Sequence, residues 1–147
     1  MTFSATFRGI FYLQKFNYTV DKGKTKGLRG VAALIRGACI RTLRVSKRTA
    51  PAGHPPFAKT RGGLRIIEYT VYRNGAIIGP VKFPGSNFFN EPVPHIHEFG
   101  GTYFSRKAYY QYPERSFMNH TLKQLIARGK IPKEFSVSMA RQFNMNP

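Results

Sequence analysis

The most regular hydrophobic pattern in the chain runs through residues 28–48. Apolar side chains recur there at helical spacing and therefore share one face; they are Leu28, Val31, Ala32, Leu34, Ile35, Ala38, Cys39 and Leu43. The other face is basic and carries Arg29, Arg36, Arg41, Arg44, Lys47 and Arg48. The pattern predicts an amphipathic helix of about 20 residues. Gly30 and Gly37 interrupt its polar face, where either another chain approaches closely or the packing is loose.

Strand patterns follow this helix. The proline-rich segment 50–57 cannot continue a helix, because proline lacks an amide donor and restricts the residue before it, so we expect an extended connector. Residues 64–72 are rich in β-branched and aromatic residues, and Asn74-Gly75 predicts a hairpin turn into a second strand over 76–81. A further β pair is expected to join 95–99 to 103–112 across Gly100-Gly101.

The remaining segments complete the predicted fold. Residues 113–128 predict a second helix, with Pro113 near its first turn and Gly129 ending it. Residues 21–27 are polar and contain glycine, which indicates a flexible loop, and residues 130–147 are expected to form a partly extended tail. The expected class is α+β: a long amphipathic N-terminal helix packed on an antiparallel β-sheet, with a second C-terminal helix, extended loops and terminal arms.

Charge narrows the range of partners. The chain has 24 Lys and Arg against 6 Asp and Glu, a formal net charge of +18. Asp21 is the one acid among residues 1–67. A surplus of this size indicates a negatively charged partner. The basic face of helix 28–48 is either a solvated surface or a contact site for DNA or an acidic protein.

Candidate catalytic chemistry is scarce. None of the few carboxylates is paired with another at a spacing suited to acid–base catalysis. In a strand, His95 and His97 would project from the same face beside Glu98, as a metal site requires, but no third ligand is visible, which favours packing, hydrogen bonding or a subunit contact. Cys39 lies on the apolar helix face and is expected to be a small buried side chain. The sequence therefore predicts a protein that is not an enzyme and has no cofactor.

No run approaches the ~20 apolar residues that a membrane-spanning helix needs, and the N-terminus lacks the layout of a signal peptide. We therefore expect a protein made in the cytoplasm, without a membrane partner.

Five short motifs occur in a fixed order after residue 50. They are Ala50-Pro51-Ala52-Gly53-His54-Pro55-Pro56, Gly63-Leu64-Arg65, Ile78-Gly79-Pro80, Pro94-His95-Ile96-His97-Glu98-Phe99-Gly100-Gly101, and Tyr112-Pro113-Glu114-Arg115-Ser116-Phe117-Met118. Together with the basic helix before them, they resemble the tail-completion or neck-protein family of long-tailed bacteriophages, in which similar motifs recur in this order. The resemblance covers roughly residues 28–128. Ser116 departs from it, since the family has proline there.

The resemblance implies a structural virion subunit. Such a subunit forms a ring with copies of itself, expected to be a hexamer, in the neck or tail-completion region that joins head to tail. Its other partners would be adjacent neck and tail proteins and the packaged double-stranded DNA in the channel. By this resemblance the chain divides into an N-terminal arm and loop (1–27), a tail-completion-like α+β domain (28–129) and a C-terminal tail (130–147).

Two sets of site residues follow. The subunit interface is expected at the connector and the histidine motif, and comprises Pro51, His54, Pro55, Pro56, Phe57, His95, His97, Glu98 and Phe99. Contact with DNA or an acidic partner is expected from the six basic residues of helix 28–48. The alternative function is a basic nucleic-acid-binding protein without catalytic activity, because the composition alone would also fit that class.

Overall fold

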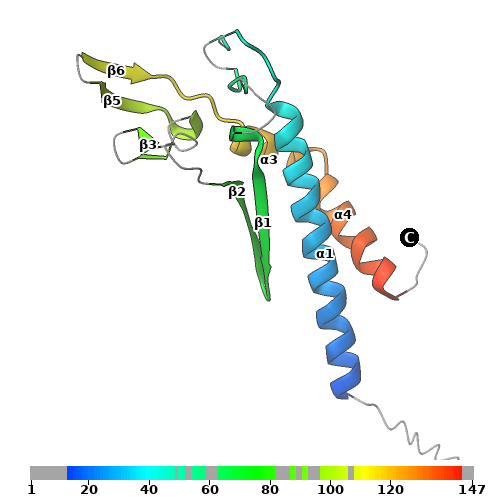
Figure 1. The fold of residues 1–147 in the computed structure, drawn as a ribbon. Helices are drawn as coiled ribbons and strands as arrows, with labels where there is room; N and C mark the ends of the chain where they lie inside the picture. The colour runs from blue at the N-terminus through cyan, green and yellow to red at the C-terminus, as the bar shows by residue number, and fades with distance from the viewer. Residues whose placement is uncertain are drawn as a thin grey trace, which may run out of the picture.

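One long helix organises the chain. α1 (Leu13–Thr42) runs along the molecule, with a β-hairpin on one side and a C-terminal helix on the other (Figure 1). The computed structural model describes residues 13–48, 50–51, 54–58, 63–81, 87–88, 91–92, 97–105 and 108–143. The predicted apolar face of α1 is confirmed, because Ala32, Ile35, Cys39 and Leu43 are all buried.

α1 begins and ends earlier than the sequence predicts. Residues 21–27, expected to form a flexible loop, are helical. The helix stops at Thr42, and residues 43–48 leave it. There the chain pairs with the connector instead: the Ala58 amide donates to the Arg44 carbonyl at 2.8 Å, and the Ser46 amide donates to the Ala58 carbonyl at 3.0 Å. These bonds replace the helical hydrogen bonds that residues 43–48 would have made.

The predicted hairpin is confirmed as β1 (Ile67–Tyr72) and β2 (Gly75–Pro80), which pair antiparallel. Tyr72 pairs with Gly75, so Arg73 and Asn74 form the turn rather than Asn74 and Gly75. The inner face of the hairpin packs on α1: Ile67 is fully buried, and Arg36 Nε donates to the Ile67 carbonyl at 2.6 Å. The outer face is open.

The second β pair differs from the prediction. β5 (Gly101–Ser105) pairs with β6 (Ala108–Tyr112), so the chain turns between these strands and not at Gly100-Gly101. Residues 97–99 are helical rather than extended. His95 lies outside the described residues. β3 (Asn87–Phe88) and β4 (Glu91–Pro92) form a further short antiparallel pair, and η1 (Gly63–Arg65) is a 3-10 turn before β1.

The C-terminal part is more helical than expected. α3 (Met118–Ala127) begins five positions after the predicted start at Pro113 and ends just before Gly129, whose φ of 61° is left-handed as a helix terminator requires. The predicted extended tail is wrong for residues 130–143. They form α4 (Lys130–Ala140) and the 3-10 turn η2 (Arg141–Phe143). Pro132 is tolerated because it lies in the first turn of α4.

Close packing at glycines of α1 explains why residues 21–27 and 130–143, predicted as a loop and a tail, are both helical. α4 lies beside α1 (Figure 1), and the side chains of Phe135 and Ser138 rest directly on Gly27 and Gly30. A Cβ at Gly27 would come within 2.7 Å of the Phe135 ring. The glycines that suggest a loop in the sequence are therefore the places where a second helix approaches the first.

The core lies where α1, β1 and α3 meet, and contains Ile35, Cys39, Leu43, Leu64, Ile67, Phe117 and Leu125. Two threonine hydroxyls link α1 to α3, since Thr42 Oγ1 lies 3.1 Å from Thr121 Oγ1. With a helix packed on a small antiparallel sheet and further helices after it, the chain has the predicted α+β class.

Replacing Gly30 by alanine should destabilise the protein, whereas replacing Gly37 should not. A Cβ at Gly30 would lie 2.7 Å from Ser138 Cβ and closer still to its hydroxyl, so α4 must move, at a cost of about 1–3 kcal/mol. At Gly37 the nearest atom would be Arg41 Nη1 at 3.4 Å, so G37A should gain up to ~1 kcal/mol of helix propensity. Urea unfolding measures the change in the free energy of unfolding in each variant. Equal changes in G30A and G37A would contradict the close packing of α4 on Gly30.

Candidate functional site

Two of the five motifs meet in space, although ten residues lie between Gly101 and Tyr112 in the sequence. The Glu98 side chain is buried at the N-terminus of α3. The amides of Phe117 and Met118 each donate to Glu98 Oε2 at 3.1 Å. The Asn119 amide and the Ser116 hydroxyl each donate to Oε1 at 2.7 Å. One carboxylate therefore satisfies the free amides of this helix end.

α3 depends on this distant residue because it has no cap of its own. Phe117 occupies the N-cap position, where it offers no side-chain acceptor, and the first turn contains no acid. A carboxylate at a helix N-terminus is favoured both by the exposed amides and by the helix dipole. The absence of a local cap is the signal in the sequence that could have pointed to a remote one.

Hydrogen bonding decides the protonation state of Glu98. Burial on its own would raise the pKa of this carboxyl, but donation from the amides of Asn119, Met118 and Phe117 and from the Ser116 hydroxyl lowers the pKa below its usual value. Glu98 is therefore ionised at neutral pH, and its charge serves to hold α3.

Gly100 makes this contact possible. Its φ of 69° is in the left-handed region, and a Cβ there would lie 2.9 Å from the Glu114 amide nitrogen and 3.0 Å from the Tyr112 carbonyl oxygen. Only glycine tolerates both the conformation and the close backbone approach. The Gly-Gly pair predicted as a hairpin turn instead brings the histidine motif against residues 112–114.

His97 supports the same junction. Its carbonyl accepts the Arg115 amide at 2.8 Å, and its Nδ1 lies 3.1 Å from the Tyr112 hydroxyl. The Arg115 guanidinium lies over the Tyr112 ring at 5.2 Å. Burial first, and then the charge of Arg115, lower the pKa of His97 to about 4, so the imidazole is neutral at physiological pH.

The predicted interface residues fall into different environments. Pro56 and Glu98 are buried within the chain, so their side chains serve the subunit itself. The connector is thus docked at Pro56 rather than free along its whole length. Exposed members are Pro51, His54 and Phe99, while Pro55, Phe57 and His97 are half-buried. For these six the interface role stays a prediction.

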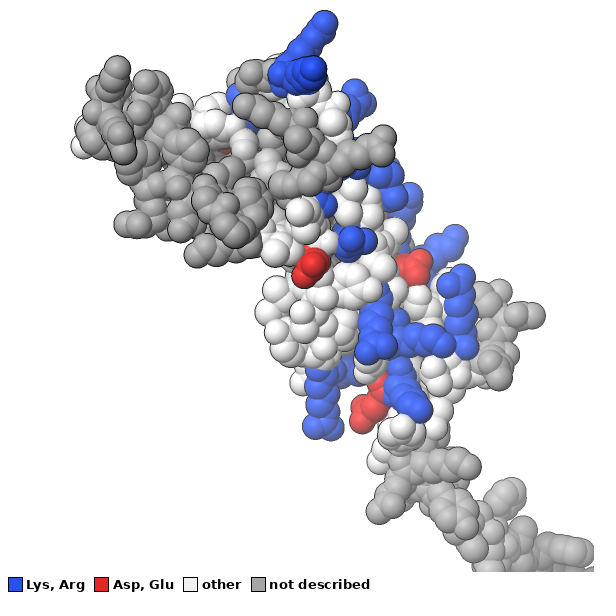
Figure 2. Space-filling model, viewed as in Figure 1, with Lys and Arg blue, Asp and Glu red and all other residues white. Residues whose placement is uncertain are grey.

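The predicted basic contact residues also separate. Arg36 is tied to the hairpin through Ile67, whereas Arg29, Arg41, Arg44, Lys47 and Arg48 are exposed. Figure 2 shows lysine and arginine side chains along the face over α1, with few acidic ones among them. Arg41 and Arg44 also line a cavity of about 680 Å³ that they share with Arg128 and Lys130. We call these four cations and the cavity between them the basic groove. Sequence reasoning missed Arg128 and Lys130, because Arg128 was predicted to end the second helix and Lys130 to begin a tail, so nothing indicated that they would meet Arg41 and Arg44.

Burial keeps both the Cys39 thiol and the His97 imidazole uncharged at neutral pH, because it raises the pKa of the thiol and lowers that of the imidazole. Cys39 is fully buried, and burial raises the pKa of its thiol to about 11, so it stays protonated. Among the described residues, no three histidine, cysteine or acidic side chains lie close enough together to hold a metal ion. Within the same ranges, no helix is both long and apolar enough to cross a membrane.

Comparison of the chain with protein-family models, with curated proteins and with solved structures finds no match.

Glu98→Gln should destabilise the protein much more than Glu114→Gln. The amide keeps the shape of Glu98 but loses its charge and one acceptor oxygen, leaving buried donors unsatisfied, which costs about 2–3 kcal/mol. Glu114 is exposed, and its replacement should change the free energy of unfolding by no more than ~0.5 kcal/mol. Because the pKa of Glu98 is lowered on folding, its contribution is complete above about pH 4.5 and is lost as the pH falls further. Denaturant unfolding at pH 7 and pH 3 tests both points, and an E98Q variant as stable as E114Q would refute the capping role.

His97 should make stability depend on pH in a higher range. Its pKa falls from 6.5 in the unfolded chain to about 4 in the folded one, so the unfolded state binds more protons between these values. Stability is therefore complete above pH 6.5 and decreases as the pH falls towards 4. His97→Gln should flatten this slope between pH 6.5 and 4.5, while the exposed His120→Gln should keep it. Thermal unfolding across this range is the measurement, and a slope retained in H97Q would count against the assignment.

Proposed function

We propose that this chain is a structural subunit of a tailed-phage virion that forms a ring in the neck or tail-completion region around the DNA channel. The observation that carries the proposal is the contact between two family-like motifs. Glu98, Phe117 and Met118, residues by which those motifs resemble the phage family, meet at the start of α3, and Gly100 approaches the backbone of residues 112–114 beside them. Chance matches scattered along a sequence have no reason to share one structural junction.

The use of the polar groups also supports a structural role. The Glu98 carboxylate is committed to α3, His97 contacts Tyr112, and Cys39 is a buried, protonated thiol. Groups that could act as acid, base or nucleophile are thereby engaged in holding the fold. We infer that the protein works through its surfaces and not through catalysis.

The β1–β2 hairpin offers a surface suited to subunit contacts. Tyr72 and Ile77 lie diagonally across the two strands on its outer face and are 55% and 66% exposed. The hairpin is a sheet of two strands; Arg36 already bonds the Ile67 carbonyl of β1, and β2 is the edge strand whose backbone groups a neighbour's strand can pair with. Exposed apolar side chains next to open edges favour assembly with other copies.

The test is made in the phage that encodes the chain. Mass spectrometry of purified particles should detect the protein at a fixed, low copy number, as expected for one ring, and disruption of its gene should leave heads and tails unjoined or tails malformed. Infectious particles lacking the protein would refute the proposal. A protein absent from particles that binds DNA as a monomer would instead favour the nucleic-acid-binding alternative.

Complementation locates the ring contact. Supplied from a plasmid, wild-type protein and the Ile126→Lys variant should restore infectivity, whereas Ile77→Lys should not. Both isoleucines are exposed, at 66% for Ile77 and 58% for Ile126, so both variants should fold, but only Ile77 lies on the hairpin's outer face. Full rescue by I77K would remove the hairpin from the interface.

A further inference from the structure

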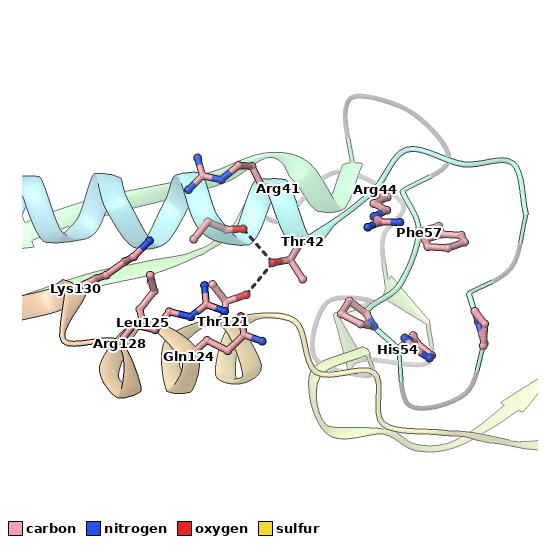
Figure 3. Close-up of a pocket in the computed structure, with 13 residues that line it drawn as sticks. Arg41, Thr42, Arg44, His54, Phe57, Thr121, Gln124, Leu125, Arg128 and Lys130 are labelled. Carbon is pink, nitrogen blue, oxygen red and sulfur yellow. Dashed lines mark hydrogen bonds between the residues drawn. The ribbon is translucent and has the colours of Figure 1, made fainter.

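The basic groove is built from segments that are far apart in the sequence. Arg41 comes from the end of α1 and Arg44 from the segment just after it, His54 and Phe57 come from the connector, and Arg128 and Lys130 from the α3–α4 junction. In Figure 3, Arg44, His54 and Phe57 lie on one side of the opening, and Gln124 and Arg128 lie on the other. Its walls are fixed, because Thr42 and Thr121 join α1 to α3 and the Arg44–Ala58 bond holds the connector.

The charge of the groove is uncompensated locally. Its described lining contains four cationic side chains and no carboxylate. Like charges placed around one opening repel each other, and a bound anion would relieve that repulsion. Neutral donors are already engaged there: the Thr42 hydroxyl contacts the Ala38 carbonyl, and Gln124 contacts His120. An incoming anion would therefore be held mainly by the guanidinium groups and Lys130.

The start of α4 adds to the same potential. α4 begins at Lys130, a lining residue, and Gly129 before it provides no side-chain cap. The first turn of α4 contains no acid. The partial positive charge of this helix end thus remains without a negative side chain nearby in the helix.

The surroundings favour phosphate over a carboxylate. Arginine guanidinium groups form paired hydrogen bonds with phosphate and carboxylate oxygens alike, so what surrounds the groove decides between them. Lys47 and Arg48 are exposed just beyond Arg44, and Arg29 lies farther back on α1, so the positive surface extends past the groove as a strand of repeated phosphates requires. The half-buried Phe57 and Pro55 line the connector side, where they can pack against a sugar or a base.

We propose that the basic groove binds a phosphate group, supplied by the backbone of a nucleic acid. The proposal rests on the proposed function insofar as the ring surrounds packaged DNA, and it gives the subunit a defined contact with that DNA. Arg44 and Arg128 hold the phosphate from opposite walls, and Arg41 and Lys130 complete the positive field.

The test compares two double variants with equal loss of charge. Arg44→Gln with Arg128→Gln removes a cation from each wall of the groove, and Arg73→Gln with Lys123→Gln removes two exposed cations elsewhere. Binding of a fluorescein-labelled DNA duplex to the full-length proteins is followed by anisotropy at several salt concentrations. The groove variant should bind roughly tenfold more weakly, and its slope of log affinity against log salt should fall by ~0.9, because one phosphate contact is lost. The control should keep the wild-type slope to within ~0.5. Thermal unfolding confirms that both variants are folded.

Three outcomes would overturn the proposal. They are equal losses in the two variants, unchanged DNA binding by the groove variant, and groove-dependent binding of polyglutamate in place of DNA, which would mark a site for an acidic protein. Inorganic phosphate distinguishes a free ion from a nucleic-acid backbone as the ligand. If phosphate stabilises the wild-type protein but not the groove variant, and the two bind DNA equally well, the site takes free phosphate and the nucleic-acid assignment fails. The DNA-binding measurement does not depend on whether the protein is found in phage particles. If the groove binds DNA but the protein is absent from virions, the proposed function is refuted and the groove assignment stands.

Discussion

The Glu98 carboxylate is the interaction on which the rest of the architecture depends. It joins the helical turn at residues 97–99 to the start of α3, and α3 in turn covers the core face of α1 through Phe117 and Leu125. Removing the carboxylate would leave the first amides of α3 without acceptors in a buried place. Because α4 follows α3 directly at Gly129, the position of the last helix also traces back to this junction. A single buried acid thus positions much of the C-terminal half.

Sequence patterns predicted the elements whose stability is local. The apolar stripe of α1 and the β1–β2 hairpin were predicted correctly, because helical spacing and strand composition report directly on which face is buried. The errors fall where one segment depends on another. The glycines at 23 and 27 looked like loop residues, although the C-terminal helical segment approaches α1 at both, and residues 130–143 looked like a tail without the partner that makes them helical. A propensity cannot report a contact with a residue one hundred positions away.

The candidate site shows the same division. His97 and Glu98 were recognised as unusual, but the strand in which they were predicted to lie is a helical turn. The sequence contained a clue to the true arrangement: no acid and no side-chain cap at the beginning of α3. The six basic residues predicted for one helix face are divided by the end of α1 at Thr42, which leaves Arg44, Lys47 and Arg48 beyond the helix. Arg36 was drawn to the hairpin, and Arg41 and Arg44 came to share a cavity with Arg128 and Lys130.

Charge and burial together explain why function should reside on the surface of this protein. A folded chain with a net charge of +18 is destabilised by its own repulsion, and selection for stability alone would remove part of that surplus. The carboxylate that contributes most to the fold, Glu98, is buried and directed at backbone amides, so it does little to neutralise the exposed arginines. The surplus of positive charge therefore lies on the surface, where a partner can reach it. An anionic partner that covered such a surface would relieve this repulsion as it bound, so the residues that weaken the isolated chain are the ones that the proposed contact with DNA would use.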